Sequence, residues 1–301
     1  MVRPLINLRG DVRRLRYIRQ KEEHNAMQTI KTVGILGLGK MGGPMAKHLV
    51  AKGFNVVGYD PVPAAGDRAK ADGVRVFTTA REVAAACDLV IVVVGFDNQI
   101  ETVVYGKDGI VEGAKPGLIV AVGSTAAPQY TKMLATRLAE KQITLLDIPL
   151  TRGEQAAVNG KLLILGAGDE GAFEACKPAF SAFASDIFHL GPAGCGQVGK
   201  MVNNLILWAC VSANDEGLHL GKALGVDPEK MRAALHYSSA QNWAMDWRAE
   251  DSGMPWAEKD MNILLREADM VRLSMPLAGT TKEVIKGLKI RMGLGLPEGF
   301  E

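Results

Sequence analysis

One lysine and two asparagines share a face near the start of a long apolar stretch. Lys200, Asn203 and Asn204 are spaced i, i+3 and i+4, which places them side by side if the segment is helical. Burying an ammonium and two amides is unfavourable unless they find polar partners, so such groups on an apolar helix are expected to line a cleft. A lysine there is suited to exchange a proton with a substrate. The spacing fits a solvated first turn with an ordinary surface lysine equally well.

A glycine-rich turn follows the first apolar run and leads into a helical stretch. It reads Gly37-Leu38-Gly39-Lys40-Met41-Gly42. The first glycine permits a tight turn, the second lets the backbone approach a pyrophosphate, and the third lets helix and strand pack closely. The N-terminus of the following helix attracts phosphates. The turn therefore predicts a dinucleotide site, and the alternative is a glycine-rich turn without a ligand.

An acidic residue ends the second apolar run. Asp60 can accept hydrogen bonds from the ribose hydroxyls on the adenine side of a dinucleotide, and its charge would repel a 2′-phosphate. The sequence continues Pro61-Val62-Pro63 without an arginine, so we expect NAD as the cofactor rather than NADP. Arg68 in the next helix leaves NADP open.

Short, fully apolar, β-branched runs alternate with helical stretches from Thr32 onward, which is typical of strands buried on both faces of a parallel sheet. The expected strands are Val33–Leu36, Val56–Tyr59, Val74–Phe77, Leu89–Val94, Leu118–Val122, Thr144–Leu146, Leu162–Leu165 and Ile187–Leu190. The fold class is therefore α/β, with a Rossmann-type doubly wound sheet over residues 32–194.

The strand pattern stops after Gly194. Residues from about Gly196 to Gly225 are apolar nearly all round, which predicts one long helix buried between partners. We expect it to bridge to an all-helical C-terminal domain, residues 195–301, for substrate binding and oligomerisation. A homodimer or homotetramer is expected because so short a domain can hardly cover the apolar helix.

The N-terminal residues 1–31 differ in charge from the rest. They carry eight Lys and Arg against three acids, while the remainder carries 27 against 30. Met27 lies just before the first strand, so this segment is either a basic extension or the product of a mis-assigned start. A slightly acidic main body argues against a nucleic-acid partner.

Several other functions have no support in the sequence. The apolar runs are strand-sized, so we expect no membrane span. The four cysteines are widely spaced, which indicates neither a disulfide framework nor a metal site and favours a reducing cytoplasm. The five histidines do not cluster and no nucleophile elbow is visible, so a hydrolase is not indicated.

Three ordered motifs resemble the β-hydroxyacid dehydrogenases, which include 3-hydroxyisobutyrate dehydrogenase and tartronate semialdehyde reductase. The motifs lie at 33–46, 147–153 and 194–204, and the resemblance runs from about residue 32 to 290. Glu258-Lys259-Asp260 resembles the family's late Lys-Asp pair, and Ser238-Ser239 with Asn242-Trp243 its Ser-rich, Trp-containing segment.

The resemblance implies a role for each motif. Lys200 is implied to be the catalytic acid/base and Asn204 its companion in holding the substrate. The residues implied to frame or close the substrate site are Ser124, Thr125, Thr151, Arg152, Gly153, Asn203, Lys259 and Asp260. The cofactor set is Gly37 to Gly42 with Asp60, Val94 and Lys259.

The chain departs from the family at one informative position. Thr151-Arg152-Gly153 stands where the family usually has Ser-Gly-Gly, and the arginine adds a fork suited to carboxylate, phosphate or sulfonate. We expect a small anionic substrate with an extra or differently placed anionic group. The alternative is that Arg152 points to solvent.

These observations favour an NAD-dependent dehydrogenase acting between a 3-hydroxy acid and its semialdehyde or keto partner. One alternative is an NADPH-dependent semialdehyde, glyoxylate or imine reductase, although imine reductases generally lack the lysine that Lys200 retains. A 6-phosphogluconate dehydrogenase would need a larger helical domain. A non-catalytic NAD-binding module is the alternative from another class.

Overall fold

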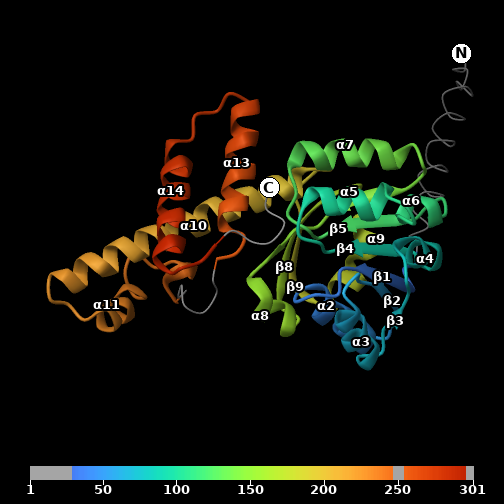
Figure 1. The fold of residues 1–301 in the computed structure, drawn as a ribbon, viewed down its shortest axis with the longest axis horizontal. Helices are drawn as coiled ribbons and strands as arrows, with labels where there is room; N and C mark the ends of the chain where they lie inside the picture. The colour runs from blue at the N-terminus through green and yellow to red at the C-terminus, as the bar shows by residue number, and fades with distance from the viewer. Residues whose placement is uncertain (1–28, 247–253, 296–301) are drawn as a thin grey trace, which may run out of the picture.

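The structure, a computed structural model, describes residues 29–246 and 254–295. A sheet with helices on both faces forms the first part and helices alone form the second (Figure 1). The strands are β1 (Thr32–Leu36), β2 (Asn55–Tyr59), β3 (Arg75–Val76), β4 (Leu89–Val92), β5 (Ile119–Val122), β6 (Thr144–Asp147), β7 (Leu150–Thr151), β8 (Leu162–Gly168) and β9 (Ala184–His189). The helices of this part are α2 (Gly42–Ala51), α3 (Pro63–Ala71), α4 (Ala80–Ala86), α5 (Asp97–Tyr105), α6 (Ile110–Gly113), α7 (Pro128–Ala139), α8 (Gly153–Val158) and α9 (Glu170–Phe180).

The strand order is β3-β2-β1-β4-β5-β6-β8-β7, with β9 paired to β8. Neighbours from β3 to β6 are parallel, which confirms the Rossmann-type sheet. β8 instead runs antiparallel to both β6 and β7, and β9 is parallel to β8. A continuous apolar run does not encode strand direction, so an all-parallel sheet was the wrong expectation beyond β6. The two-residue strand β7 was not predicted at all.

An apolar layer packs on each face of the sheet, because successive side chains of a strand point to opposite faces. Ile91 of β4 lies in the layer that contains Leu49 and Phe173, and its neighbours Val90 and Val92 lie in the other. All five side chains are fully buried. This rigid sheet carries the loops in which the glycine turn and the substrate motifs lie.

One helix of 29 residues leads from the sheet into the second part, as the sequence predicted. It is α10 (Cys195–Ala223), and at 1.5 Å per residue it is about 43 Å long. Around it lie α11 (Pro228–Leu235), the 3₁₀ turn η1 (Trp243–Asp246), α13 (Ala257–Met270) and α14 (Pro276–Arg291). Trp208 of α10, Met261 of α13 and Ile285 of α14 share the apolar core of this part.

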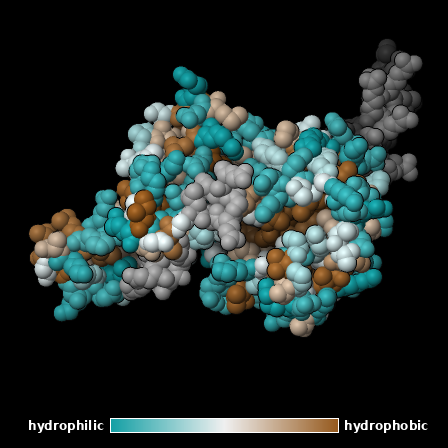
Figure 2. All heavy atoms as spheres, viewed as in Figure 1, coloured by the Kyte–Doolittle hydropathy of each residue, from teal (hydrophilic) through white to brown (hydrophobic). Residues whose placement is uncertain are grey.

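The long helix is not covered along its whole length in the single chain. Val198, Val202 and Ile206, spaced four apart, are 42%, 51% and 58% exposed. Farther along, Leu220 and Leu224 are exposed as well, and Figure 2 shows apolar side chains gathered at the tip where α10 meets α11. Burial between partners, which the sequence predicted for this helix, is therefore not achieved within one chain.

Residues 1–28 lie outside the described part, so the two expectations for the basic N-terminal segment stay predictions. Within the described residues, no helix combines the length and apolarity that a bilayer crossing requires. The four cysteines are free thiols. No cluster of potential metal ligands occurs among these residues either.

Candidate active site

Lys200 lies in the second turn of α10 and extends toward the edge of the sheet. Its Nζ donates a hydrogen bond of 2.7 Å to the carbonyl oxygen of Leu150 in β7. Burial lowers the pKa of this lysine, the charge of Asp260 opposes that shift, and nearby Lys259 adds to it. The side chain is thus a half-buried amine that loses its proton more easily than an ordinary lysine.

The two asparagines next to Lys200 connect α10 with α13. Asn204 donates from Nδ2 to Asp260 Oδ2 at 2.7 Å, and Asn203 donates to the side-chain oxygen of Asn204 at 2.9 Å. Burial raises the pKa of Asp260, while the charges of Lys200 and Lys259 lower it. The structure therefore brings together the lysine, both asparagines and the acidic residue that the sequence singled out.

Lys259 joins the helical part to the sheet. Its Nζ donates to the carbonyl oxygens of Gly95 at 2.6 Å and Thr125 at 3.0 Å. The ammonium also lies 5.2 Å from the ring centre of Phe96 and 5.6 Å from that of Trp256. Burial lowers the pKa of Lys259, and Asp260 opposes this. One side chain thus links the helical part to the sheet.

Ser124 lies at the end of β5, where it fastens the neighbouring loop. Its Oγ accepts a hydrogen bond of 2.8 Å from the backbone N–H of Val94. Gln197 of α10 donates to the Ser124 carbonyl at 2.8 Å and accepts from the N–H of Ala126 at 3.0 Å. The loop after β5, which contains Thr125, is therefore held against the start of α10.

Two residues that the sequence reasoning did not single out organise this region. Asp147, at the end of β6, is fully buried and accepts from the backbone N–H groups of Gly194 and Gln197, each at 3.0 Å. Gln197 is fully buried as well. Both lie within the motifs at 147–153 and 194–204. An acidic residue at the end of an apolar strand could have identified Asp147 from the sequence.

The segment from β7 to α8 contains the departure from the pattern of the family that the motifs resemble. Thr151 is buried, whereas the exposed Arg152 donates from Nη1 to Asp186 Oδ2 of β9 at 2.6 Å. The same Nη1 donates to Ser185 Oγ at 2.9 Å. Gly153 begins α8. Arg152 is thus engaged by β9 in this structure, and its contact with a substrate anion stays a prediction.

The glycine turn fits a dinucleotide. A Cβ on Gly37 would lie 2.1 Å from the carbonyl oxygen of Val93, and one on Gly42 would lie 1.9 Å from that of Gly37, so both positions require glycine for packing. A Cβ on Gly39 would meet no atom within 4 Å, which leaves open space over the backbone where a pyrophosphate can lie. The first turn of α2 carries no acidic residue, as anion binding there demands.

Asp60 organises the same turn. Its Oδ2 accepts from the N–H of Leu38 at 2.7 Å and its Oδ1 from that of Val62 at 2.8 Å. Lys40, exposed on the turn, lies 3.4 Å from Glu154 of α8. Met41 is the residue before α2. The glycine turn and Asp60 therefore lie together at the carboxyl ends of β1 and β2.

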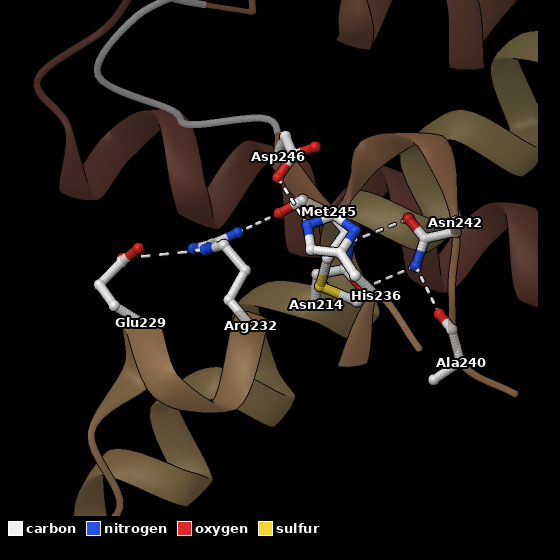
Figure 3. Close-up of polar contacts among 8 residues, drawn as sticks. All are labelled: Asn214, Glu229, Arg232, His236, Ala240, Asn242, Met245 and Asp246. Carbon is white, nitrogen blue, oxygen red and sulfur yellow. Dashed lines mark hydrogen bonds and ion pairs between the residues drawn. The ribbon is translucent and has the colours of Figure 1, made fainter. Parts of the chain in front are cut away.

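The segment after α11 is fastened to α10 rather than to the cleft. Figure 3 shows Asn242 and Asn214 of α10 exchanging two hydrogen bonds, each of 3.1 Å. Arg232 of α11 donates to the carbonyl of Met245. Trp243 is 69% exposed. In this structure the Ser- and Trp-containing motif therefore holds η1 against α10.

Taken together, a dinucleotide turn in a Rossmann domain and a half-buried lysine of lowered pKa, where this domain meets the helical part, define an NAD(P)-dependent dehydrogenase. Residues 32–191 match the NAD binding domain of 6-phosphogluconate dehydrogenase. Residues 194–295 match a second family, described as the NAD-binding of NADP-dependent 3-hydroxyisobutyrate dehydrogenase. The chain belongs to the β-hydroxyacid dehydrogenase family and is an NAD(P)-dependent hydroxyacid oxidoreductase.

Individual relatives agree with this assignment. The 2-(hydroxymethyl)glutarate dehydrogenase of Eubacterium barkeri is 31% identical, over 87% of this chain and 90% of its own length. The NAD-dependent L-serine dehydrogenase of Pseudomonas aeruginosa is 32% identical, over 72% of this chain and 73% of its own. A crystal structure of 3-hydroxyisobutyrate dehydrogenase from Salmonella typhimurium has a TM-score of 0.78 at 26% identity and covers 88% of this chain and 96% of that one.

Proposed function

We propose that this protein is an NAD-dependent dehydrogenase that oxidises a small 3-hydroxy acid, or reduces its semialdehyde or keto partner, with Lys200 as general acid/base. The observation that carries the proposal is the half-buried Lys200, whose pKa is lowered where α10 meets β7. Relatives named for hydroxy-acid and L-serine oxidation support the substrate class.

Hydride transfer and proton transfer are assigned to different groups. A bound nicotinamide supplies the hydride acceptor or donor. Lys200 Nζ removes the proton from the substrate hydroxyl in oxidation and returns it in reduction. Burial favours the neutral amine that oxidation requires, and a positive nicotinamide ring nearby would favour it further. Asn204, held by Asp260 at 2.7 Å, supplies an amide oriented beside the lysine for the substrate.

The carboxylate of the substrate is assigned to the two loops that face the start of α10. Ser124 and Thr125 lie on the loop after β5, which Gln197 and Lys259 hold in place. Thr151 is the last residue of β7 and Gly153 is the first residue of α8, with Arg152 between them. Hydroxyl and backbone N–H groups in these loops are suitable donors to a carboxylate.

The preference for NAD over NADP rests on Asp60. Its carboxylate is fixed at the end of β2 by two backbone N–H groups, so its negative charge faces the position expected for the adenine ribose. Asp60→Ala is expected to raise the ratio of kcat/KM with NADP to kcat/KM with NAD. Arg68→Ala serves as the matched control for a contribution from α3.

A second anionic group on the substrate is the finer proposal. It is supported by the guanidinium of Arg152 beside Thr151 and by a relative named for a glutarate, which has two carboxylates. Asp186 already holds Arg152, so Arg152→Gly is compared with Asp186→Asn, which frees the guanidinium without removing it. An Arg152→Gly enzyme with an unchanged ratio of kcat/KM for dicarboxylate over monocarboxylate substrates would refute this proposal.

The first experiment follows absorbance at 340 nm with NAD or NADP against a panel of 3-hydroxy acids, and with reduced cofactors against their semialdehydes. Turnover that depends on Lys200 supports the proposal. Tight cofactor binding without turnover of any panel member would favour the non-catalytic alternative. The free cysteines are consistent with the cytoplasmic location that we also propose.

A further inference from the structure

Three consecutive charged residues open α13, and all are buried. Glu258, Lys259 and Asp260 are 9%, 8% and 8% exposed. Lys259 reaches the sheet domain and Asp260 reaches α10, as described above. Glu258 faces the third neighbour, α14, where Lys289 Nζ donates to its Oε2 at 2.7 Å. The first turn of α13 is thus bonded to the sheet domain, to α10 and to α14 through three adjacent side chains.

The Glu258–Lys289 ion pair is withdrawn from water. The side chains are 11% and 2% exposed, and apolar neighbours such as Ile285 and Leu288 already join α14 to the core. Desolvating two charges offsets much of their attraction, and apolar residues of similar size often serve packing equally well. The pair instead fixes the orientation of the Glu258 side chain, because a short hydrogen bond determines where its carboxylate lies.

Direction matters because successive residues of an α-helix project about 100° apart around its axis. Holding the Glu258 side chain toward α14 therefore sets the angle at which Lys259 and Asp260 leave the same turn. A small rotation of this turn would lengthen the contact from Lys259 to the Gly95 carbonyl and the one from Asp260 to Asn204, which are now 2.6 Å and 2.7 Å.

We propose that Lys289, acting through Glu258, is a positioning residue that aims Lys259 and Asp260 at the active-site cleft. The proposal rests on the proposed function, in which Lys200 exchanges the proton. Lys289 touches neither Lys200 nor the loops that face it. Its effect passes through α13, since the charge of Asp260 acts directly on Lys200.

The test is the double variant Glu258→Gln with Lys289→Met, which preserves side-chain size and leaves no lone buried charge. We expect a melting temperature close to that of the wild type and a kcat lower by about ten- to a hundredfold, the range for small misplacements of catalytic groups. The acidic limb of kcat/KM for oxidation should also move to lower pH, because a displaced Asp260 no longer raises the pKa of Lys200.

The matched control removes another ion pair of α14. Arg291 Nη2 lies 3.0 Å from Asp215 Oδ2 on α10, so this pair joins α14 to α10 and not to α13. The control variant Asp215→Asn with Arg291→Met should keep the wild-type kcat and pH limb. A double Glu258/Lys289 variant that also keeps both, whether or not its melting temperature falls, would overturn the proposal.

A second readout does not depend on turnover. Amide hydrogen exchange in the peptide 257–264 should accelerate in the Glu258/Lys289 variant without substrate and stay unchanged in the control. If the wild type turns over no substrate, the proposed function fails while this exchange still decides the inference. Should the double variant not fold, Lys289→Arg keeps the charge but changes the reach, and unchanged exchange and kinetics in that enzyme would contradict the proposal.

Discussion

The ammonium of Lys200 and the carbonyl oxygen of Leu150 lie 2.7 Å apart and join α10 to the short strand β7. A carbonyl only accepts, so the lysine can donate to it in either protonation state. The contact places the amine against the backbone of β7, one residue before Thr151. It therefore holds the proposed acid/base next to the proposed carboxylate site without fixing its charge.

Replacing this lysine should abolish chemistry but spare cofactor binding. Lys200→Met keeps an apolar stem of similar length, so the fold should persist, while kcat falls about 10²- to 10⁴-fold through loss of proton transfer. Fluorescence titration with the reduced cofactor should give a dissociation constant within about twofold of the wild type, since the glycine turn lies elsewhere. Lys222→Met, at the exposed far end of α10, is the control.

The pH profile of oxidation should report the lowered pKa of Lys200. Only the deprotonated amine accepts a proton, so kcat/KM rises with pH through a limb that lies below the ordinary lysine value of 10.5. Asp260→Asn removes a charge that raises this pKa, so the limb should move to still lower pH. Asp227→Asn removes a carboxylate at the N-cap of α11, beyond the far end of α10, and a limb that moves equally in both variants would contradict the assignment.

The sequence predicted the parts of this structure that local patterns encode. Apolar β-branched runs marked the parallel strands, and the helix from Cys195 followed from its apolar length. The strand expected over Leu89–Val94 ends at Val92, because the backbone N–H of Val94 turns to Ser124. Such an end depends on a partner thirty residues away, which no local pattern contains.

In the candidate site, too, the sequence predicted what local spacing encodes and not what depends on distant partners. The spacing of Lys200 and Asn204 placed them on one face, and the structure agrees. The partners that hold them come from β7 and α13, far along the chain, and Lys289 was not recognised because nothing near it in sequence carries a motif. The contact between Arg152 and Asp186 depends on how β9 joins the sheet, so it could not be predicted from the sequence either.

Two glycines of the cofactor turn should respond differently to the same substitution. Gly39→Ala adds a methyl group into open space, so the melting temperature should hold while the KM for the cofactor rises, because the methyl group occupies the expected pyrophosphate position. Gly37→Ala introduces strain, since Gly37 has φ +96° and its Cβ would lie 2.1 Å from the Val93 carbonyl. That variant should lose stability. Thermal melts beside cofactor titrations distinguish the two, and equal melting losses would contradict the open cradle.

Removing Asp147 should weaken the junction between sheet and long helix. Asp147→Ala leaves the N–H groups of Gly194 and Gln197 without their acceptor, at about 1–3 kcal/mol for each buried group. The melting temperature should fall by about 2–4 °C per kcal/mol. Asp169→Ala, which removes the exposed cap of α9, is the comparison, and an Asp147 variant no less stable than this control would count against the role.

The exposed apolar stripe of α10 predicts self-association. Val198, Val202 and Ile206 lie on one helix face, and Leu190, 44% exposed, packs against Gly199 of the same helix. A contiguous apolar surface of this kind is typical of an interface, so sedimentation at micromolar concentration should show a dimer or tetramer. Val202→Glu places a charge in the stripe and should shift the protein toward monomer, whereas Lys222→Glu, on the same helix but outside the stripe, should not. A wild type that sediments as a stable monomer would refute the prediction.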